Sequence, residues 1–407
     1  MAEERATGVR PSGDATPAVS SAQIASTGPA ATTESVPAPA RAGGRTGLDE
    51  QTRNRVLFAV FVAFLLLYPL IDRGLGFGRM GSMNPILIFT LLALGLNIVV
   101  GFAGLLDLGY AAFFAIGGYT VAFLTAPQSP LVQRGFVADY WLALPIAFVV
   151  AAIFGLILGA PTLRLRGDYL AIVTLAFGEI VPQAIRNLEG LTNGTKGMNP
   201  IGRPTFGNVE LLASDQVPWY YLILAVTAFS VYIIVRLRDS RLGRAWMAMR
   251  EDEIAAASMG INLVKTKLLA FALGASFSGF GGALYASMLQ YIGPDQFDFS
   301  ISIILLAMVI MGGIGNIWGV IFGGIVLGAF NFILVDSATG WLRSLSEILN
   351  LPFLAIDLVN AKLLLFGLAL VLMMLLRPEG IFPSAQRKAE LRRGRGTPGV
   401  SANGAGA

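Results

Sequence analysis

Long apolar runs alternate with short polar connections along most of the chain. A helix needs about 20 apolar residues to cross a hydrocarbon core of roughly 30 Å, and several runs approach this length. The expected crossings are residues 56–71, 84–100, 105–125, 140–161, 168–188, 218–235, 267–289, a close pair within 300–335, and 361–376. The pattern therefore predicts an all-α polytopic membrane protein with about ten transmembrane or re-entrant helices.

Glycines interrupt the apolar pattern in two stretches, residues 94–119 and 308–330. Glycine costs helix stability, and within a bilayer the neighbouring protein must satisfy the backbone groups that a break releases. Both stretches therefore predict broken or re-entrant helices buried against others. Glycines four residues apart also let helix backbones approach closely, either for static packing or for a bundle that changes shape. Such pairs are Gly155/Gly159, Gly319/Gly323 and Gly324/Gly328.

The composition fits a membrane protein and excludes several kinds of chemistry. Hydrophobic residues make up 55% and charged residues 13% of the chain, and the charged share is about half that of a soluble domain. The chain has no cysteine and no histidine, which excludes disulfides and removes the commonest general base and metal ligand. We predict no metal site. The net charge of +4 is explained by basic residues beside the spans, so nucleic acid is not an expected partner.

The two ends of the chain differ from its centre. We expect residues 1–52 to form a disordered cytoplasmic tail, residues 53–380 the transmembrane domain, and residues 381–407 a disordered basic tail. If the N-terminus is cytoplasmic, ten crossings return the C-terminus to the cytoplasm. The connection after residue 235 and the C-terminal tail, which are both rich in arginine, then lie inside, although five basic residues fall outside. We therefore predict a multi-pass protein of the inner cell membrane with both termini in the cytoplasm.

A few polar residues lie within or beside the apolar runs. An unpaired carboxylate at the bilayer centre costs roughly 2.5 to 3.5 kcal/mol on insertion scales, so such residues usually face a cavity or a partner. Asp107 is alternatively a cap for a helix that starts at Leu108, and Glu179 is alternatively a partner of Arg186 or an interfacial residue. With the glycines of the second broken stretch, the candidates for a translocation path are Asn97, Asp107, Glu179, Gly313, Gly315 and Asn316.

Residues 243–262, GRAWMAMREDEIAAASMGIN, are too polar to span and lie on the predicted cytoplasmic side. Leu242, Trp246 and Met249 fall at helical spacing and are expected to rest on the underside of the bundle. Acidic residues then begin a short alanine-rich helix, and Gly260 ends it. This arrangement favours a short docking helix over a catalytic loop, because it contains no nucleophile–base pair. A solvated amphipathic connector is the alternative.

The residues of this segment resemble a known family. REDEIAAASMGI resembles the coupling segment of permeases of ABC importers. LGLNIVVGFAGLLDLGYAAFFAIGGY, TLAFGEI, FSGFGGALYA and MGGIGNIWGVIFGG narrow the resemblance to branched-chain amino acid permeases of the LivM type. The resemblance extends from about Leu94 to Glu379. The departures are the long N-terminal tail and the loop EGLTNGTKGMNPIGRP, where Lys196 and Met198 replace a more glycine-rich pattern.

The resemblance implies a subunit of an ATP-driven importer of leucine, isoleucine and valine. Its implied partners are a second permease, two ABC ATPase subunits, a solute-binding protein and the lipid bilayer. The chain has no G-x-x-x-x-G-K-[ST] phosphate loop, so we expect no enzymatic activity and no cofactor on this chain, with ATP hydrolysed by the partners. The residues implied in ATPase coupling are Arg244, Arg250, Glu251, Asp252, Glu253, Ala255, Ala256 and Gly260.

Other functions are compatible with the same pattern. Urea, short amides or another amino acid are alternative substrates, since related permeases share these motifs. An ion-coupled carrier or channel working alone is a less favoured alternative, because buried carboxylates are few and histidine is absent. A membrane scaffold without a transport role is less favoured because of the many glycine breaks.

Overall fold

The computed structural model describes residues 47–349 except 77, 163, 164, 166 and 208, together with 364, 367, 368, 371 and 375. The longer helices are α1 (Gly47–Leu75), α2 (Met80–Leu96), α3 (Tyr110–Thr125), α5 (Tyr140–Thr162), α6 (Asp168–Asn187), α8 (Gln216–Arg238), α9 (Arg241–Glu251), α11 (Leu263–Leu289), α12 (Phe299–Gly312), α13 (Ile317–Ala329) and α14 (Val335–Leu349). The short ones are α4 (Pro130–Gln133), α7 (Glu189–Thr192) and α10 (Glu253–Ser258), and the antiparallel strands are β1 (Thr205–Phe206) and β2 (Val209–Glu210). Single turns of 3-10 helix cover Gly194–Lys196 and Pro294–Gln296, and π-helices cover Asn97–Phe102 and Phe330–Leu334.

The chain divides into two compact units, residues up to Val62 and residues from Ala63 onward. The second unit contains the helix bundle. Helix α1 begins at Gly47, six residues before the boundary predicted at residue 53. Residues 1–46 of the predicted N-terminal tail (1–52) and the whole predicted C-terminal tail (381–407) lie outside the described residues.

Eight helical segments among the described residues are long and apolar enough to cross a membrane. They match eight of the predicted crossings, from Met80–Phe102 through Ile317–Ser344. The predicted crossing at 56–71 is helical within α1, and the one at 361–376 falls mostly outside the described residues. The predicted all-α polytopic membrane fold is therefore confirmed.

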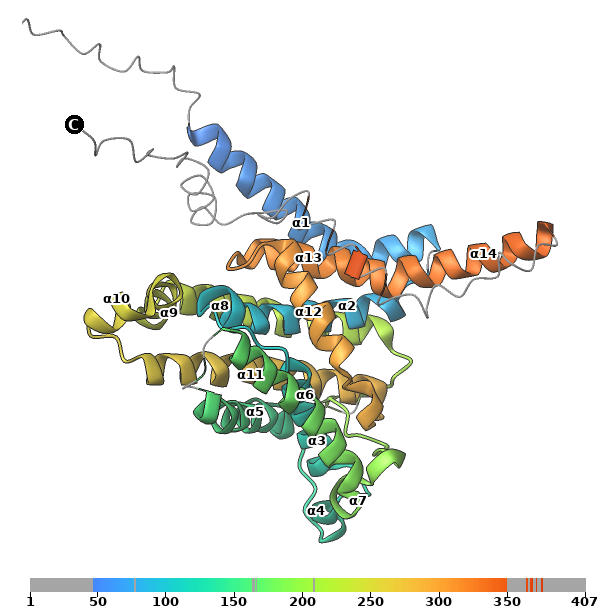
Figure 1. The fold of residues 1–407 in the computed structure, drawn as a ribbon. Coiled ribbons are helices and arrows are strands. Elements are labelled where there is room, and N and C mark those ends of the chain that lie inside the picture. Colours follow the sequence, from blue (N-terminus) through green and yellow to red (C-terminus); the bar gives the residue numbers. More distant parts are fainter. Residues whose placement is uncertain are drawn as a thin grey trace, which may run out of the picture. The chain divides into compact units, whose positions relative to one another are not determined.

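Helix α11 occupies the centre of the bundle and packs against α5, α3 and α2 (Figure 1). Small residues permit this close packing. A methyl group on Gly155 of α5 would lie 2.8 Å from both the Ala275 side chain and the Phe271 carbonyl of α11, and one on Gly279 would overlap Ala151. The predicted Gly155/Gly159 pair therefore serves the packing of α5 on α11.

The glycines of α13 form two packing faces. A methyl group on Gly323 would lie 2.7 Å from the Gly312 nitrogen of α12. One on Gly324 would lie 2.7 Å from the Thr90 hydroxyl of α2, and one on Gly328 would lie 2.9 Å from Ile86. The two consecutive glycine pairs of the sequence therefore pack α13 against two different helices.

A proline inside α1 leaves a backbone carbonyl that α8 satisfies. Pro69 has no N–H group, so it cannot donate to the carbonyl of Leu65, four residues earlier. The buried Tyr220 hydroxyl donates to that carbonyl at 2.6 Å, and the Tyr221 hydroxyl donates to the next one, of Leu66, at 3.2 Å. The last turns of α1 are thereby joined to α8, which is how a membrane helix tolerates an internal proline.

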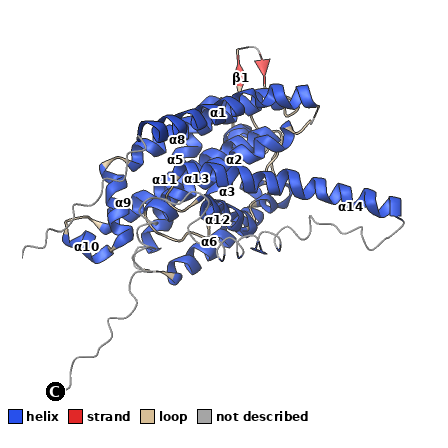
Figure 2. Ribbon diagram, turned by 90° about the horizontal axis from the view of Figure 1, so that it is seen from above, coloured by secondary structure: helices blue, strands red, loops and turns tan. Residues whose placement is uncertain are grey.

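Helices α9 and α10 lie at one end of the bundle, and the β1–β2 hairpin lies at the opposite end (Figure 2). Helices α9 and α10 connect the end of α8 to the start of α11, so both of these helix ends lie at the same end of the bundle. We refer to these ends as the α9–α10 side and the hairpin side.

Candidate coupling segment and translocation path

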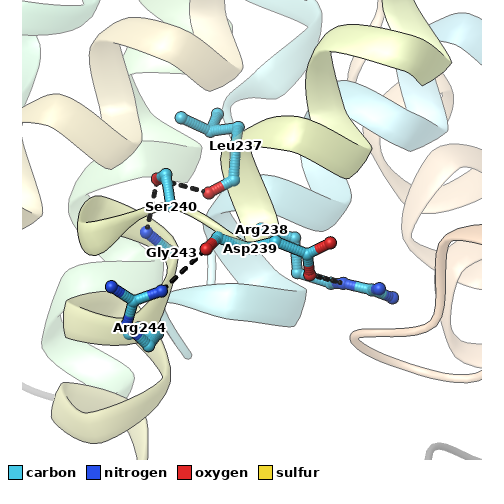
Figure 3. Close-up of polar contacts among 6 residues, drawn as sticks. All are labelled: Leu237, Arg238, Asp239, Ser240, Gly243 and Arg244. Carbon is cyan, nitrogen blue, oxygen red and sulfur yellow. Dashed lines mark hydrogen bonds and ion pairs between the residues drawn. The ribbon is translucent and has the colours of Figure 1, made fainter.

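A tight turn joins α8 to α9 and sets the direction in which the α9–α10 segment leaves α8 (Figure 3). The Ser240 hydroxyl donates to the Leu237 carbonyl at 2.6 Å and accepts from the Gly243 N–H at 3.3 Å, which caps α9. Arg244 donates to the Asp239 carbonyl at 2.7 Å. A side chain at Gly243 would overlap the carbonyls of Leu237 and Arg238, so the turn requires glycine there.

One face of α9 is buried in the bundle, as the spacing of its apolar residues predicts. Trp246 is fully buried and donates from its indole nitrogen to the Thr266 carbonyl of α11 at 2.8 Å. Met249 is also buried, whereas Leu242 is 36% exposed. This face therefore holds α9 firmly against the start of α11.

Helix α10 has well-formed ends. The Asp252 carboxylate accepts from the N–H groups of Ile254 and Ala255 at 2.8 and 3.0 Å, which is an N-cap. At the other end Gly260 has a φ of +83°, and the Ile261 N–H donates to the Ala256 carbonyl at 3.1 Å. This is the Schellman geometry that favours glycine, so the predicted helix end at Gly260 is confirmed.

The outward face of α10 differs from the expected one. Ala256 is buried against this chain at 4% exposure, so it does not present a contact surface. Ala255 and Gly260 are exposed, and so are two larger apolar residues, Ile254 at 71% and Met259 at 84%. Neither residue was predictable from the sequence pattern, because a helix of six residues is too short to define a face by periodicity.

A half-buried ion pair connects α10 to α11. The Lys267 ammonium lies 2.6 Å from the Glu253 carboxylate, and these side chains are 7% and 26% exposed. A buried ammonium needs such a partner, because desolvation of a lone charge is costly. Lys267 was not predicted as a functional residue, although a lysine at the start of an apolar run is a usable signal. Glu251 is exposed at the end of α9.

Arg250, at the end of α9, reaches both glycine-broken segments. Its guanidinium donates to the Gly101 carbonyl at 2.6 Å. A methyl group on Gly104 would lie 2.7 Å from the Arg250 side chain, and one on Gly315 would lie 3.1 Å from its guanidinium. Because all three glycines lack a side chain, Arg250 can lie directly on their backbones.

The same two breaks are joined to each other through Asn97. This buried residue begins the π-helix Asn97–Phe102, and its side-chain oxygen accepts from the Gly315 N–H at 2.9 Å. Its amide nitrogen has no hydrogen-bond partner in the part of the chain that the structure describes. π-helical turns often mark functional sites in membrane and soluble helices.

Asp107 lies in the non-helical stretch between the π-helix and α3. It is 1% exposed, and one carboxylate oxygen accepts from the Gly109 N–H at 2.9 Å while the other has no hydrogen-bond partner among the described residues. Helix α3 begins at Tyr110 with Gly109 at its N-cap, so Asp107 bonds one residue ahead of the helix rather than capping a helix from Leu108. Asp107 is one of the residues that surround a cavity of about 80 Å³ between α3, α5, α6 and α11.

Glu179 is exposed on α6. At a rise of 1.5 Å per residue it lies about 16 Å along the helix from Asp168, near the middle of α6. The alternative pairing of Glu179 with Arg186 is wrong, because Arg186 instead pairs with Asp295 at 2.7 Å. Long-range pairing of this kind cannot be read from spacing along one helix. An exposed carboxylate near the middle of an apolar helix requires water or a partner subunit beside it.

The remaining path candidates form the turn between α12 and α13. Gly313 and Gly315 have φ values of +109° and +84°, which favour glycine. Asn316 caps α13 by accepting from the Trp318 N–H at 3.2 Å. Of the six candidates, Asn97 bonds to Gly315, which lies against Arg250, whereas Asp107 is beside a separate cavity and Glu179 is exposed on α6.

Comparison with known proteins places the chain in a family. The family described as "Branched-chain amino acid transport system / permease component" matches residues 80–376. The high-affinity branched-chain amino acid transport system permease protein LivM of Escherichia coli K12 is 37% identical over 368 residues, covering 85% of this chain and 79% of the relative.

More distant relatives come from an archaeon and from a second permease type. A probable branched-chain amino acid transport permease protein LivM of Methanocaldococcus jannaschii is 26% identical over 71% of this chain and 84% of the relative. The LivH permease protein of Escherichia coli K12 is 25% identical over 59% of this chain and 79% of the relative. No solved structure matches the chain.

Proposed function

Because the chain belongs to the family of branched-chain amino acid transport permeases, we propose that it is a permease subunit of an ATP-driven importer for leucine, isoleucine and valine. Its relatives are named as permeases of the high-affinity branched-chain amino acid transport system. In this proposal the chain forms one half of a membrane path and performs no reaction of its own. ATP is hydrolysed by partner subunits, and this chain binds no cofactor.

The observation that carries the proposal is the position of Arg250. This residue belongs to a segment outside the membrane spans, yet its guanidinium donates to the Gly101 carbonyl of the first broken helix and lies against Gly315 of the second. A subunit driven from outside needs a contact of this kind, because a force on the α9–α10 segment must reach the backbone of the spans. The bond at 2.6 Å provides that route.

We propose that two ABC ATPase subunits act on the importer and that one of them docks on α10. Ile254 and Met259 supply an exposed apolar surface on this helix, and Ala255 and Gly260 allow close approach. Glu253 connects that surface to α11 through Lys267. Docking on α10 makes the α9–α10 side cytoplasmic, and both chain termini are then in the cytoplasm of an inner-membrane protein.

We propose a second permease subunit beside α6. Glu179 is exposed on this helix together with apolar residues such as Ile172 and Ile180. A carboxylate in that position is unfavourable against lipid and favourable against a water-filled path between two permeases. A solute-binding protein would then deliver substrate on the hairpin side.

Reconstitution tests the function directly. Liposomes that contain this chain, the second permease, both ATPases and the binding protein should accumulate labelled leucine only when ATP is present. Omission of the ATPases should abolish accumulation. Concentrative uptake by this chain alone would contradict the proposal, and transport of urea or a short amide in place of leucine would contradict the substrate assignment.

The docking surface on α10 has its own test. Ala255→Arg or Met259→Asp should reduce co-purification of the ATPase by about tenfold or more, because an unpaired charge would be desolvated where the partner closes. Ser214→Arg, at an exposed position on the hairpin side, is the matched control. Ala256 is unsuitable for this purpose, since a charge at this buried position would disturb α10 itself. Unchanged co-purification would make α10 a connector.

A further inference from the structure

A dense group of arginines lies where α8 ends and α9 begins. The nine residues from Arg236 to Arg244 carry four arginines and a single carboxylate, Asp239, so their net charge is +3. The next carboxylate along the chain, Glu251, is at the other end of α9, ten residues and about 15 Å from Arg241. The corner between α8 and α9 is therefore a strongly basic surface that its own segment does not neutralise.

Only part of this charge is used inside the chain. Arg238 pairs with Asp239 at 3.1 Å, and Arg244 donates to the Asp239 carbonyl at 2.7 Å from the opposite side of the turn (Figure 3). Arg236 and Arg241 are exposed, and neither has a carboxylate partner among the described residues. An anion that is not part of this chain can therefore reach both guanidinium groups.

Arg236 lies at the level where an apolar span gives way to polar headgroups. It follows Gln216, the first residue of α8, by 20 residues, or about 30 Å, which matches a hydrocarbon core of roughly 30 Å. Side chains of a helix lean toward its N-terminus, which for Arg236 is the direction of the bilayer. Its guanidinium accordingly lies over the ring of Tyr232, 5.4 Å from the centroid, and does not extend away from the spans.

The face of α8 that leads to Arg236 is apolar and open. Phe229 and Tyr232 are both 58% exposed, and Ala225 and Ala228 are exposed on the same side. Helix α8 is also the least buried of the eight segments among the described residues that are long enough to cross a membrane. Because Phe229, Tyr232 and Arg236 follow one another at helical spacing, an acyl chain on this face would place its headgroup beside the arginine.

We propose that Arg236 and Arg241 bind the headgroup phosphates of anionic phospholipids, whose acyl chains lie on the exposed face of α8. Guanidinium groups suit phosphate because their planar donors bind two oxygens at once. A zwitterionic headgroup offers the same phosphate but carries its own cation, so it gains less from a surface of net positive charge. The proposal requires only that the chain spans a membrane, and it does not depend on the transported substrate.

A lipid titration followed by native mass spectrometry tests the proposal on the full chain in detergent. We expect phosphatidylglycerol to bind more tightly than phosphatidylcholine. Each basic side chain near an anionic surface contributes about fivefold in affinity, so Arg236→Gln combined with Arg241→Gln should weaken phosphatidylglycerol binding by about tenfold or more. Arg134→Gln combined with Lys196→Gln is the matched control, because it removes the same charge from exposed positions on the hairpin side.

Four results would overturn the proposal. The first is equal binding of phosphatidylglycerol by the double glutamine variant and the wild type, and the second is a wild type that does not distinguish the two lipids. Displacement of phosphatidylglycerol by inorganic phosphate at equal concentration would assign the arginines to a free anion. Loss of the bound lipid when the ATPase subunits assemble with the chain would assign them to a protein partner.

Two further variants separate the contributions. Arg236→Lys combined with Arg241→Lys keeps the charge and should keep the preference for phosphatidylglycerol, whereas loss of that preference would contradict the role of charge. Tyr232→Leu removes the ring beneath Arg236 and should weaken binding less than the double glutamine variant. Should the latter not purify, Arg241→Gln alone gives the same test at about fivefold. Lipid binding is measured without transport, so failure of leucine uptake would leave this result unchanged.

Discussion

The two glycine-broken segments, residues 94–119 and 308–330, contain similar residues but have opposite effects on the packing of the bundle. In the first, the π-helix Asn97–Phe102 leads into a stretch without helix that reaches Tyr110, and a cavity lies beside it. In the second, α12 and α13 are joined by only four residues, Gly313 to Asn316, and their backbones are in close contact at Gly312 and Gly319. The first break opens space within the bundle, and the second brings two helices together.

The difference shows that glycine content alone does not define a path. What separates the two breaks is the polar residue each one holds. Among the described residues, Asp107 has one carboxylate oxygen without a hydrogen-bond partner, whereas Asn316 uses its side-chain oxygen to cap the next helix. Arg250 and Asn97 nevertheless connect both breaks, so a movement of one break is transmitted to the other.

The largest expected effect comes from filling the second break. Gly315→Leu places a side chain at a φ of +84°, which costs about 1–2 kcal/mol, and it also pushes against the Arg250 guanidinium. We expect ATP-driven leucine uptake to fall below detection while the protein still inserts. Gly340→Leu is the control, because nothing lies within 4 Å of a side chain there. Normal uptake by Gly315→Leu would show that the second break is not needed for transport.

Removal of the connection between the breaks should have the next largest effect. Arg250→Ala loses the hydrogen bond to the Gly101 carbonyl, and bonds made by charged groups contribute about 1.5–3 kcal/mol. We expect leucine uptake to fall by at least about tenfold, with ATP hydrolysis no longer stimulated by substrate. Arg250→Lys should recover part of the activity, because the ammonium can reach the same carbonyl. If Ala and Lys behave alike, the bond to Gly101 has no role in coupling.

A smaller effect should follow from removing the hydrogen bond by which α6 supports the first break. Thr174→Val leaves the Leu108 N–H without its acceptor, and an unsatisfied buried donor costs about 1–3 kcal/mol. The thermal stability of the purified protein should fall by a corresponding amount, and leucine uptake should fall with it. Thr174→Ser keeps the hydroxyl and should restore most of the stability. A stable Thr174→Val protein would mean that the first break holds its shape without α6.

The smallest effect is expected at the cap of the second break. Asn316→Ala removes the acceptor for the Trp318 N–H, and the loss of an N-cap typically costs about 1 kcal/mol. Thermal unfolding should shift slightly, and uptake should remain close to that of the wild type. Asn316→Ser keeps a capping oxygen and is the matched control. A loss of uptake as large as that of Gly315→Leu would give Asn316 a role in the path itself.

Much of the fold was predictable because membrane spans depend on local sequence. The apolar runs predicted eight of the long helices, and the glycine pairs predicted close helix contacts. The buried face of α9 and the end of α10 also followed from the spacing of Trp246 and Met249 and from Gly260. Each of these features is determined within a few turns of helix.

The contacts that build the site were less predictable because their partners are far apart in sequence. Arg250 and Gly101 are separated by 149 residues, and Arg186 and Asp295 by 109. No pattern along the chain shows that a residue of the α9–α10 segment touches a broken span. The burial of Ala256 likewise depends on where α10 lies against α11, which a six-residue helix does not reveal.

Helix α11 (Leu263–Leu289) is long enough to connect the two faces of a membrane. Its 27 residues rise about 40 Å, with Lys267 bound to Glu253 near one end. Just beyond its other end Ile292 exchanges two backbone hydrogen bonds with the buried Met198, in a loop on the hairpin side. A rod held at both tips cannot tilt at one face without moving the other. In the proposed importer, a load on α10 and occupancy of the hairpin side are therefore coupled through the same displacement of α11.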